Sequence, residues 1–246
     1  MVILRRDPAH RPRAAARPRR IKITPLRILI LLAVLVIGIG GGGYALLKGW
    51  EPSRTRYPVQ GITISSANGP INWLATRGSG IDFAYLVATS GKDRRDPGFE
   101  ANWSAVPEAG LRRGAVHVYS LCQPAVDQAN AFNTFVPAAK DALPVAIDIQ
   151  FRDDCTARPD KATLVSDLTR FVTMVETHTA KPVLLRIGKS VESTYGLSAA
   201  LPRPIWAMAD IVTPDYAAQP WRMWRASSFR RIEGIKGPVN WDVVAR

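Results

Sequence analysis

Short apolar runs recur along residues 57–246 of this 246-residue chain and alternate with stretches that repeat at helical spacing. Eight runs have the length and composition of buried strands, at residues 61–65, 83–89, 114–120, 144–150, 182–188, 205–210, 221–227 and 239–244. The clearest helical pattern spans about 161–178, where Leu164, Leu168 and Phe171 repeat on one face after Asp160 as a plausible N-cap. Further helices are predicted at about 99–109 and 125–135.

The order of these elements predicts the fold class. Strands that alternate with helices are typical of β/α units, and eight strands favour a barrel. The last three predicted strands follow one another with little room for helices between them. We therefore expect an α/β fold, an irregular TIM-like (β/α) barrel with helices mainly around its first five strands.

A different pattern precedes the barrel. Residues 28–47 form an uncharged apolar run that is closed by Lys48, and about 20 such residues can cross a bilayer as a helix. The predicted organisation is a basic cytoplasmic tail at 1–27, a transmembrane helix at 28–47, a linker at 48–56 and the barrel domain at 57–246. A cleaved signal peptide stays open as the alternative, although the apolar run is long for one.

The formal net charge of +13 matters through its distribution. Residues 1–27 carry nine Arg or Lys side chains against a single acid, Asp7, so the rest of the chain is only mildly basic. Positive charge is retained on the cytoplasmic side of a membrane. We therefore expect a single-pass protein of the inner (cytoplasmic) membrane with a cytoplasmic N-terminus and a periplasmic, extracytoplasmic barrel. A mildly basic barrel without DNA-binding motifs also argues against nucleic acid as a partner.

The chain has two cysteines, Cys122 and Cys155, and both fall in the part expected to be exported. An even number of cysteines outside the cytoplasm favours a disulfide between them. Two buried thiols are the alternative.

Five segments, taken in order, resemble glycoside hydrolase family 25, the lysozyme or N-acetylmuramidase type. They are GITIS with INW, GIDFAYLVATSGKDRRDPGFEANW, AGLRRGAVHVY, LPVAIDIQ, and WRMWRASS with GIKGPVNWDVV. The resemblance covers residues 57–246, and the order of the segments carries it more than any single motif. It implies a lysozyme-like barrel that acts on or binds peptidoglycan or a related N-acetylated glycan.

The same resemblance shows where this chain departs from the family. The family's general acid is the glutamate of an Asp-x-Glu motif, and Gln150 stands at that position. Two further family aspartates are replaced by Thr63 and Asn240, so Asp148 is the only family carboxylate that is retained. Glycoside hydrolysis needs a proton donor and a second carboxylate. The resemblance therefore implies a catalytically impaired domain, a pseudoenzyme.

Strand alternation places Ala146, Asp148 and Gln150 on one face of their strand. It places Gly61, Thr63 and Ser65 on one face of the first strand in the same way. These residues are expected to line the barrel mouth together with Asn240. The family likeness further points to substrate-binding roles for four residues: His117, Tyr119, Trp224 and Arg225. Packing roles for His117 and the tryptophans are the alternative. Five further basic residues are expected to form a solvated cationic face, with a basic rim that meets anionic wall groups as the alternative: Arg186, Arg225, Arg230, Arg231 and Lys236.

Three functions follow from these expectations. The first is a membrane-tethered module that binds peptidoglycan without hydrolysing it. The second is an active muramidase in which Asp148, with Asp153, Asp154 or Asp242, supplies the acid. The third is an envelope scaffold that binds another protein. No cofactor is expected, and no metal-ligand spacing is visible in the sequence.

Overall fold

The structure is a computed structural model that describes residues 24–246. Most of the predicted basic tail, residues 1–23, lies outside the described residues. The chain divides into two compact units, one that ends at Tyr44 and one that spans Ala45–Arg246. Each unit is described by itself.

The first unit consists of helix α1, Pro25–Lys48, whose last residues continue into the second unit. Its segment Ile28–Ala45 has a mean hydropathy of 2.3 and is long and apolar enough to cross a membrane. A membrane anchor and a signal sequence share these properties. The predicted apolar helix is therefore present, and its length agrees with one membrane crossing.

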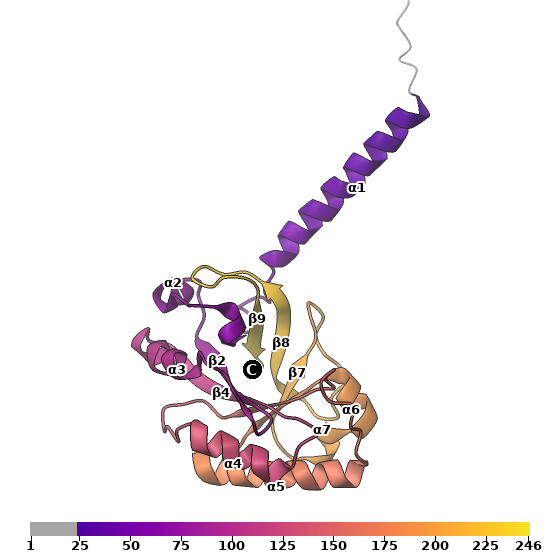
Figure 1. Ribbon diagram of the computed structural model, residues 1–246. Helices are drawn as coiled ribbons and strands as arrows, with labels where there is room; N and C mark the ends of the chain where they lie inside the picture. The colour runs from indigo at the N-terminus through magenta and orange to yellow at the C-terminus, as the bar shows by residue number, and fades with distance from the viewer. Residues whose placement is uncertain (1–23) are drawn as a thin grey trace, which may run out of the picture. The chain divides into compact units, whose positions relative to one another are not determined.

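The second unit is a closed barrel with helices around it (Figure 1). Its strands are β1 (Gln60–Ile64), β2 (Phe83–Ser90), β4 (Arg112–Val118), β5 (Ala146–Ile149), β6 (Leu184–Ile187), β7 (Ile205–Met208), β8 (Trp221–Arg230) and β9 (Val239–Val244). Strands β1, β2 and β4 to β8 pair in parallel. Strand β9 runs antiparallel between β8 and β1, and this closes the sheet in an irregular way. A two-residue strand, β3 (Arg94–Arg95), extends the β2 edge.

Helices occupy the connections that follow the first five barrel strands, as predicted. They are α2 (Trp73–Gly78), α3 (Phe99–Glu108), α4 (Ala125–Phe135), α5 (Lys161–Thr179), α6 (Lys189–Tyr195) and α7 (Leu197–Ala200), with a 3-10 turn at Ser66–Asn68. In the described chain no helix separates β7, β8 and β9. The irregular α/β barrel expected from the sequence is confirmed. Figure 1 shows α4 and α5 side by side on one flank of the barrel.

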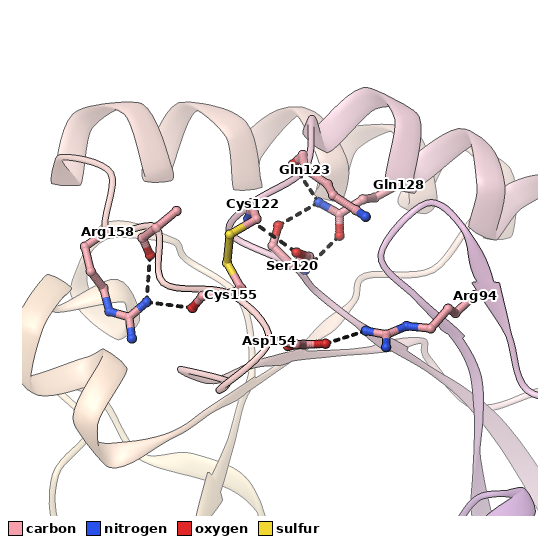
Figure 2. The surroundings of a disulfide bond; sticks show 9 residues. Arg94, Ser120, Cys122, Gln123, Gln128, Asp154, Cys155 and Arg158 are labelled. Carbon is pink, nitrogen blue, oxygen red and sulfur yellow. Dashed lines mark hydrogen bonds and ion pairs between the residues drawn. A yellow bond between two sulfur atoms is a disulfide. The ribbon is translucent and has the colours of Figure 1, made fainter.

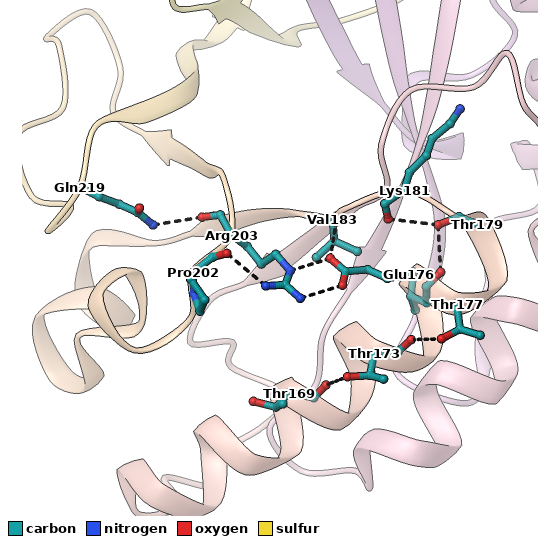
Figure 3. Close-up of polar contacts among 11 residues, drawn as sticks. Thr169, Thr173, Glu176, Thr177, Thr179, Lys181, Val183, Pro202, Arg203 and Gln219 are labelled. Atoms are coloured by element: carbon teal, nitrogen blue, oxygen red, sulfur yellow. Dashed lines mark hydrogen bonds and ion pairs between the residues drawn. The ribbon is translucent and has the colours of Figure 1, made fainter.

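Helix α5 begins where the sequence predicts, because the Asp160 side chain accepts a hydrogen bond from the Thr163 N–H at 3.0 Å. Near its other end, Glu176 accepts two hydrogen bonds from Arg203, at 2.6 and 2.8 Å (Figure 3). Burial alone would raise the pKa of Glu176, but the hydrogen bonds from Arg203 and from the Val183 N–H outweigh it and lower that pKa. This network fixes α5 to the start of β6 and to the loop before β7.

The barrel strands bury two separate apolar surfaces. Their outward side chains pack against the helices in the larger core. Their inward side chains form a smaller cluster of Phe83, Tyr85, Val116, Ala146, Leu184, Trp206 and Met223. Gly114 is required beside this cluster, because a Cβ atom at that position would clash with the Tyr85 ring.

The segment 48–56, expected as a linker, is docked on the barrel unit. The Trp50 ring meets the Trp224 ring edge-on, with centroids 6.3 Å apart. Arg230 donates a hydrogen bond to the Gly49 carbonyl at 2.6 Å and forms an ion pair with Glu51 at 2.6 Å. The linker therefore packs on the outside of β8 instead of leaving the barrel unit as a free tether.

Candidate functional site

A pocket of about 410 Å³ opens at the carboxyl ends of the barrel strands. Its lining is Thr63, Ile64, Ser65, Asn68, Val87, Ser90, Asp96, Val118, Asp148, Gln150, Arg152, Arg186, Arg225 and Asn240. This end of a parallel barrel is where enzymes of such folds build their active sites. The pocket brings together Thr63, Asp148, Gln150 and Asn240 from three strands that are far apart in the sequence.

The centre of the pocket is the end of β5. The Gln150 amide Nε2 donates hydrogen bonds to both carboxyl oxygens of Asp148, at 2.7 and 2.9 Å. The backbone carbonyl of Asp148 accepts a hydrogen bond from the Tyr119 N–H at 2.9 Å, which ties β5 to the end of β4. The Asp148 side chain is therefore held by an amide that has no proton to give to a leaving group.

Arginines surround this pair. The Arg186 Nε lies 3.9 Å from one Asp148 oxygen, and an Arg152 Nη lies 3.9 Å from the other. Arg186 is only 4% exposed, and its guanidinium sits over the Trp206 ring at 5.1 Å from the centroid. On β8, the Arg225 Nε is 3.9 Å from Asp210. The pocket thus holds three guanidinium groups near a single central carboxyl group.

A second carboxyl group lies beneath the pocket. Asp242 on β9 is fully buried and accepts a hydrogen bond from the Thr63 hydroxyl at 2.7 Å. Burial raises the pKa of Asp242 to about 7, against the lowering effects of Arg186, Thr63 and Arg225. The sequence offered Asp242 only as one candidate acid among several. The alternation that places Asn240 at the mouth also places Asp242 inside the barrel.

His117 lies away from the pocket, on the outward face of β4. Its ring is fully buried and stacks on Phe171 with centroids 4.6 Å apart. Its Nδ1 lies 2.8 Å from the Thr89 hydroxyl, and its Nε2 lies 3.2 Å from the Gln128 carbonyl oxygen. Burial lowers the pKa of His117 to about 4. The structure therefore gives His117 the environment of a neutral core residue.

Tyr119 and Trp224 also lie outside the pocket lining. The Tyr119 ring is buried edge-on against Phe171, with centroids 5.5 Å apart. Trp224 is buried on the outer side of β8, where its Nε1 donates a hydrogen bond to the Ala209 carbonyl at 2.7 Å. Of the four residues expected to bind substrate, only Arg225 reaches the mouth. No tryptophan is among the described residues that line it.

A disulfide joins Cys122 to Cys155, with Cα atoms 5.8 Å apart, and confirms the predicted pairing (Figure 2). It connects the loop after β4 to the loop after β5. The Cys155 N–H donates a hydrogen bond to the Arg152 carbonyl at 3.1 Å. The bridge therefore steadies the loop that carries Arg152 to the pocket. An ion pair between Arg94 and Asp154 at 2.6 Å holds the same loop from the other side.

The basic rim, the alternative to a solvated cationic face, is only partly present at the mouth. Arg186 is a buried wall of the pocket and not a rim residue, and Arg225 lies beside it. Arg230 is engaged with Glu51 and lies over the Trp241 ring at 4.1 Å from its centroid. Arg152 was not singled out from the sequence, because nothing in its local pattern separates it from other loop arginines. In residues 24–246 no group of three His, Cys, Asp or Glu side chains is placed to hold a metal ion.

Comparison with known proteins agrees with this geometry. The family model for glycosyl hydrolases family 25 matches residues 62–235. The chain is 29% identical to the uncharacterised Escherichia coli K12 protein YegX over 194 residues, which cover 76% of this chain and 70% of that protein. It is 26% identical to lysozyme M1 of Streptomyces globisporus over 201 residues, which cover 74% of this chain and 66% of that protein.

Solved structures share the fold. A family 25 glycosyl hydrolase from Bacillus anthracis superposes with a TM-score of 0.73 at 24% identity, over 80% of this chain and 92% of that one. The lysozyme of Streptomyces coelicolor superposes with a TM-score of 0.65 at 25% identity, over 76% of this chain and 91% of that one. The barrel, the placement of its pocket and the matched residues lead to one conclusion: this chain is a member of glycosyl hydrolase family 25.

Proposed function

We propose that this protein is a membrane-anchored, lysozyme-like module that binds peptidoglycan and hydrolyses it poorly or not at all. The observation that carries the proposal is Gln150, which the family resemblance places at the general-acid position and whose Nε2 donates hydrogen bonds to both Asp148 oxygens.

The chemistry of glycoside cleavage supports the proposal. Cleavage needs one carboxylic acid to protonate the leaving oxygen and a second carboxylate about 5 to 9 Å away. Gln150 has no acidic proton, and Thr63 and Asn240 carry no charge at the other two positions. Besides Asp148, the described lining contains one carboxylate, Asp96, which accepts hydrogen bonds from the Ser66 N–H and hydroxyl at 2.9 Å. Loss of a general acid alone costs about 10² to 10⁴ in rate.

The pocket keeps the features of a binding site. Its volume of about 410 Å³ is within the usual range for small-molecule sites. Amide and hydroxyl groups of Ser90, Gln150 and Asn240 line it, and these groups pair well with sugar hydroxyl and acetamido groups. An open, polar mouth favours a glycan over a purely scaffolding role.

The anchor and the disulfide support an envelope location. Helix α1 is preceded by the basic tail, and this order favours a cytoplasmic N-terminus with the barrel on the far side of the inner membrane. The bridge between Cys122 and Cys155 suits an oxidising compartment such as the periplasm.

The first experiment measures release of reducing ends from purified peptidoglycan by the full chain in detergent micelles, beside an active family 25 lysozyme. Sedimentation of the protein with insoluble peptidoglycan measures binding in the same sample. We expect binding without release above background. Release at a rate near that of the lysozyme would refute the impaired-hydrolysis part of the proposal.

One observation favours residual activity as a second candidate. Asp242 has a pKa raised to about 7, a value that suits a general acid near neutral pH. It is fully buried below Thr63, so a sugar would have to displace that side chain to reach it. If slow release is found, its loss in Asp242→Asn but not in Asp148→Asn would assign the acid to Asp242.

A further inference from the structure

The Arg186 guanidinium is buried in the pocket wall without the hydrogen bonds that such a group normally has. It is 4% exposed, and the contact of its Nε is the Met208 sulfur at 3.2 Å, a weak acceptor. No described residue accepts a hydrogen bond from either of its Nη atoms, and Asp148 lies 3.9 Å from Nε, beyond hydrogen-bond reach. Because Arg186 lines the pocket, these Nη donors are available to a ligand that enters it.

Arg225 is in a similar state on the neighbouring wall. Its Nε is buried and has no hydrogen-bond partner among the described residues, and Asp210 stands 3.9 Å away. In the sheet, Arg225 pairs in register with Asp242, the buried carboxyl group beneath the pocket. Arg186 from β6 and Arg225 from β8 therefore line the same cavity, and neither guanidinium has a hydrogen bond to a described carboxyl group.

The acidic groups of the pocket do not use these donors. Both oxygens of Asp148 accept from Gln150, which leaves the arginines at ion-pair distance only. Asp96 is bound to Ser66 at the edge of the mouth. With Arg152 at the entrance, the cavity holds more positive than negative groups. Such a cavity is complementary to an anion.

We propose that Arg186 and Arg225, with Arg152 at the entrance, form a subsite for a free carboxylate carried on a short side chain of an N-acetylated sugar, with no peptide attached to it. This inference rests on the proposed glycan-binding function and names the ligand class of that site. Guanidinium groups bind carboxylates through paired, charge-assisted hydrogen bonds. The amides of Gln150 and Asn240 around them suit the hydroxyl and acetamido groups of the same sugar.

Isothermal titration of the full chain in detergent micelles tests the subsite with four small ligands. They are the disaccharide of N-acetylglucosamine and N-acetylmuramic acid, its neutral methylamide, the same disaccharide bearing a stem peptide, and N,N′-diacetylchitobiose. We expect the free acid to bind about 10- to 100-fold more tightly than the methylamide, the range for one charge-assisted hydrogen-bonding pair. Its affinity also falls as salt is raised.

Variants of the pocket arginines test whether these side chains cause the preference for the free acid. Arg186→Gln should reduce the preference for the acid over the methylamide to about 3-fold or less. Arg112→Gln, an exposed arginine at the opposite end of the barrel, is the matched control and should keep the full preference. Because Arg186 is buried, its variant has a risk of misfolding. Arg152→Gln, at the half-exposed entrance, should give a smaller loss of about 3- to 10-fold in a folded protein.

The outcomes separate the two proposals. Equal binding of the acid, the methylamide and N,N′-diacetylchitobiose would overturn the carboxylate subsite and leave glycan binding intact. Binding of none of the sugars would overturn the proposed function and the subsite together. Preference for the peptide-bearing disaccharide over the free acid, or displacement by inorganic phosphate ahead of acetate, would overturn the assignment to a sugar carboxylate.

Discussion

The two ends of the barrel are hollow to a similar extent but have opposite chemistry. The mouth at the carboxyl ends of the strands encloses about 410 Å³ between polar and charged side chains. The amino end encloses about 390 Å³, mostly between apolar side chains that include Phe83, Leu184 and Met223. The same strands contribute to both ends. The difference indicates that one end of the barrel serves stability and the other is free to bind a ligand.

Asp242 marks the boundary between the two ends. It belongs to the barrel interior, yet its hydrogen bond and its nearest charges come from the mouth, through Thr63, Arg186 and Arg225. Substitutions of the side chains that line the two cavities should therefore differ in their effect on stability, which we expect to be large at the amino end and small at the mouth.

Phe83→Ala should have the largest effect. Phe83 is buried at the amino end and packs edge-on against Tyr85, and its loss should lower the free energy of unfolding by about 3 to 5 kcal/mol. The matched variant Val87→Ala, on the same strand at the mouth, should lower it by less than about 1.5 kcal/mol. Urea denaturation measures both. Equal losses would contradict the division between the two ends.

Removal of the disulfide should be the next largest effect and the largest at the mouth. Cys122→Ser combined with Cys155→Ser releases a loop with a sequence separation of 33 residues, and the expected loss is about 2 to 4 kcal/mol. Since the bridge steadies the Arg152 loop, affinity for an acidic sugar should fall as well. Thermal unfolding with and without a reductant checks the first part, and calorimetric titration checks the second. Unchanged affinity would show that the loop holds its position without the bridge.

Asp242 should make stability depend on pH. Its pKa is raised from 3.8 to about 7 by burial, so the native state keeps a proton that the unfolded state has released between these values. Stability from this group is complete below about pH 4 and is lost as the pH rises to about 7.

Unfolding of the wild type and of Asp242→Asn at several pH values measures this effect. From pH 5 to pH 8 the wild type should lose about 1 to 3 kcal/mol relative to the variant. The opposite trend, with the wild type gaining stability as the pH rises, would show that the arginines keep Asp242 ionised.

Asn240→Ala should have the smallest effect on folding. No described residue hydrogen-bonds to its side chain, which is half-buried at the mouth, so we expect a change in unfolding free energy within about 0.5 kcal/mol. Glycan affinity should fall several-fold if this amide contacts the sugar. A loss of stability comparable to that of Phe83→Ala would mean that the mouth, too, is built for stability.

The sequence by itself determined much of the architecture. Apolar runs and helical periodicity placed every barrel strand and the long helix α5, because these patterns follow from local geometry and burial. The two-residue period placed Asp148 and Gln150 on one face of β5, and Thr63 and Asn240 reach the same pocket. The chain has two cysteines, so a disulfide within it could join only Cys122 to Cys155.

The tertiary structure decided which face of each strand points inward. Alternation groups residues by face but does not say which face meets the helices, and His117 and Trp224 prove to lie on the outer one. It also decided the charge of the pocket. Arg186, Arg225 and Asp242 come together only when β9 inserts between β8 and β1, because that antiparallel closure joins strands from opposite ends of the sequence.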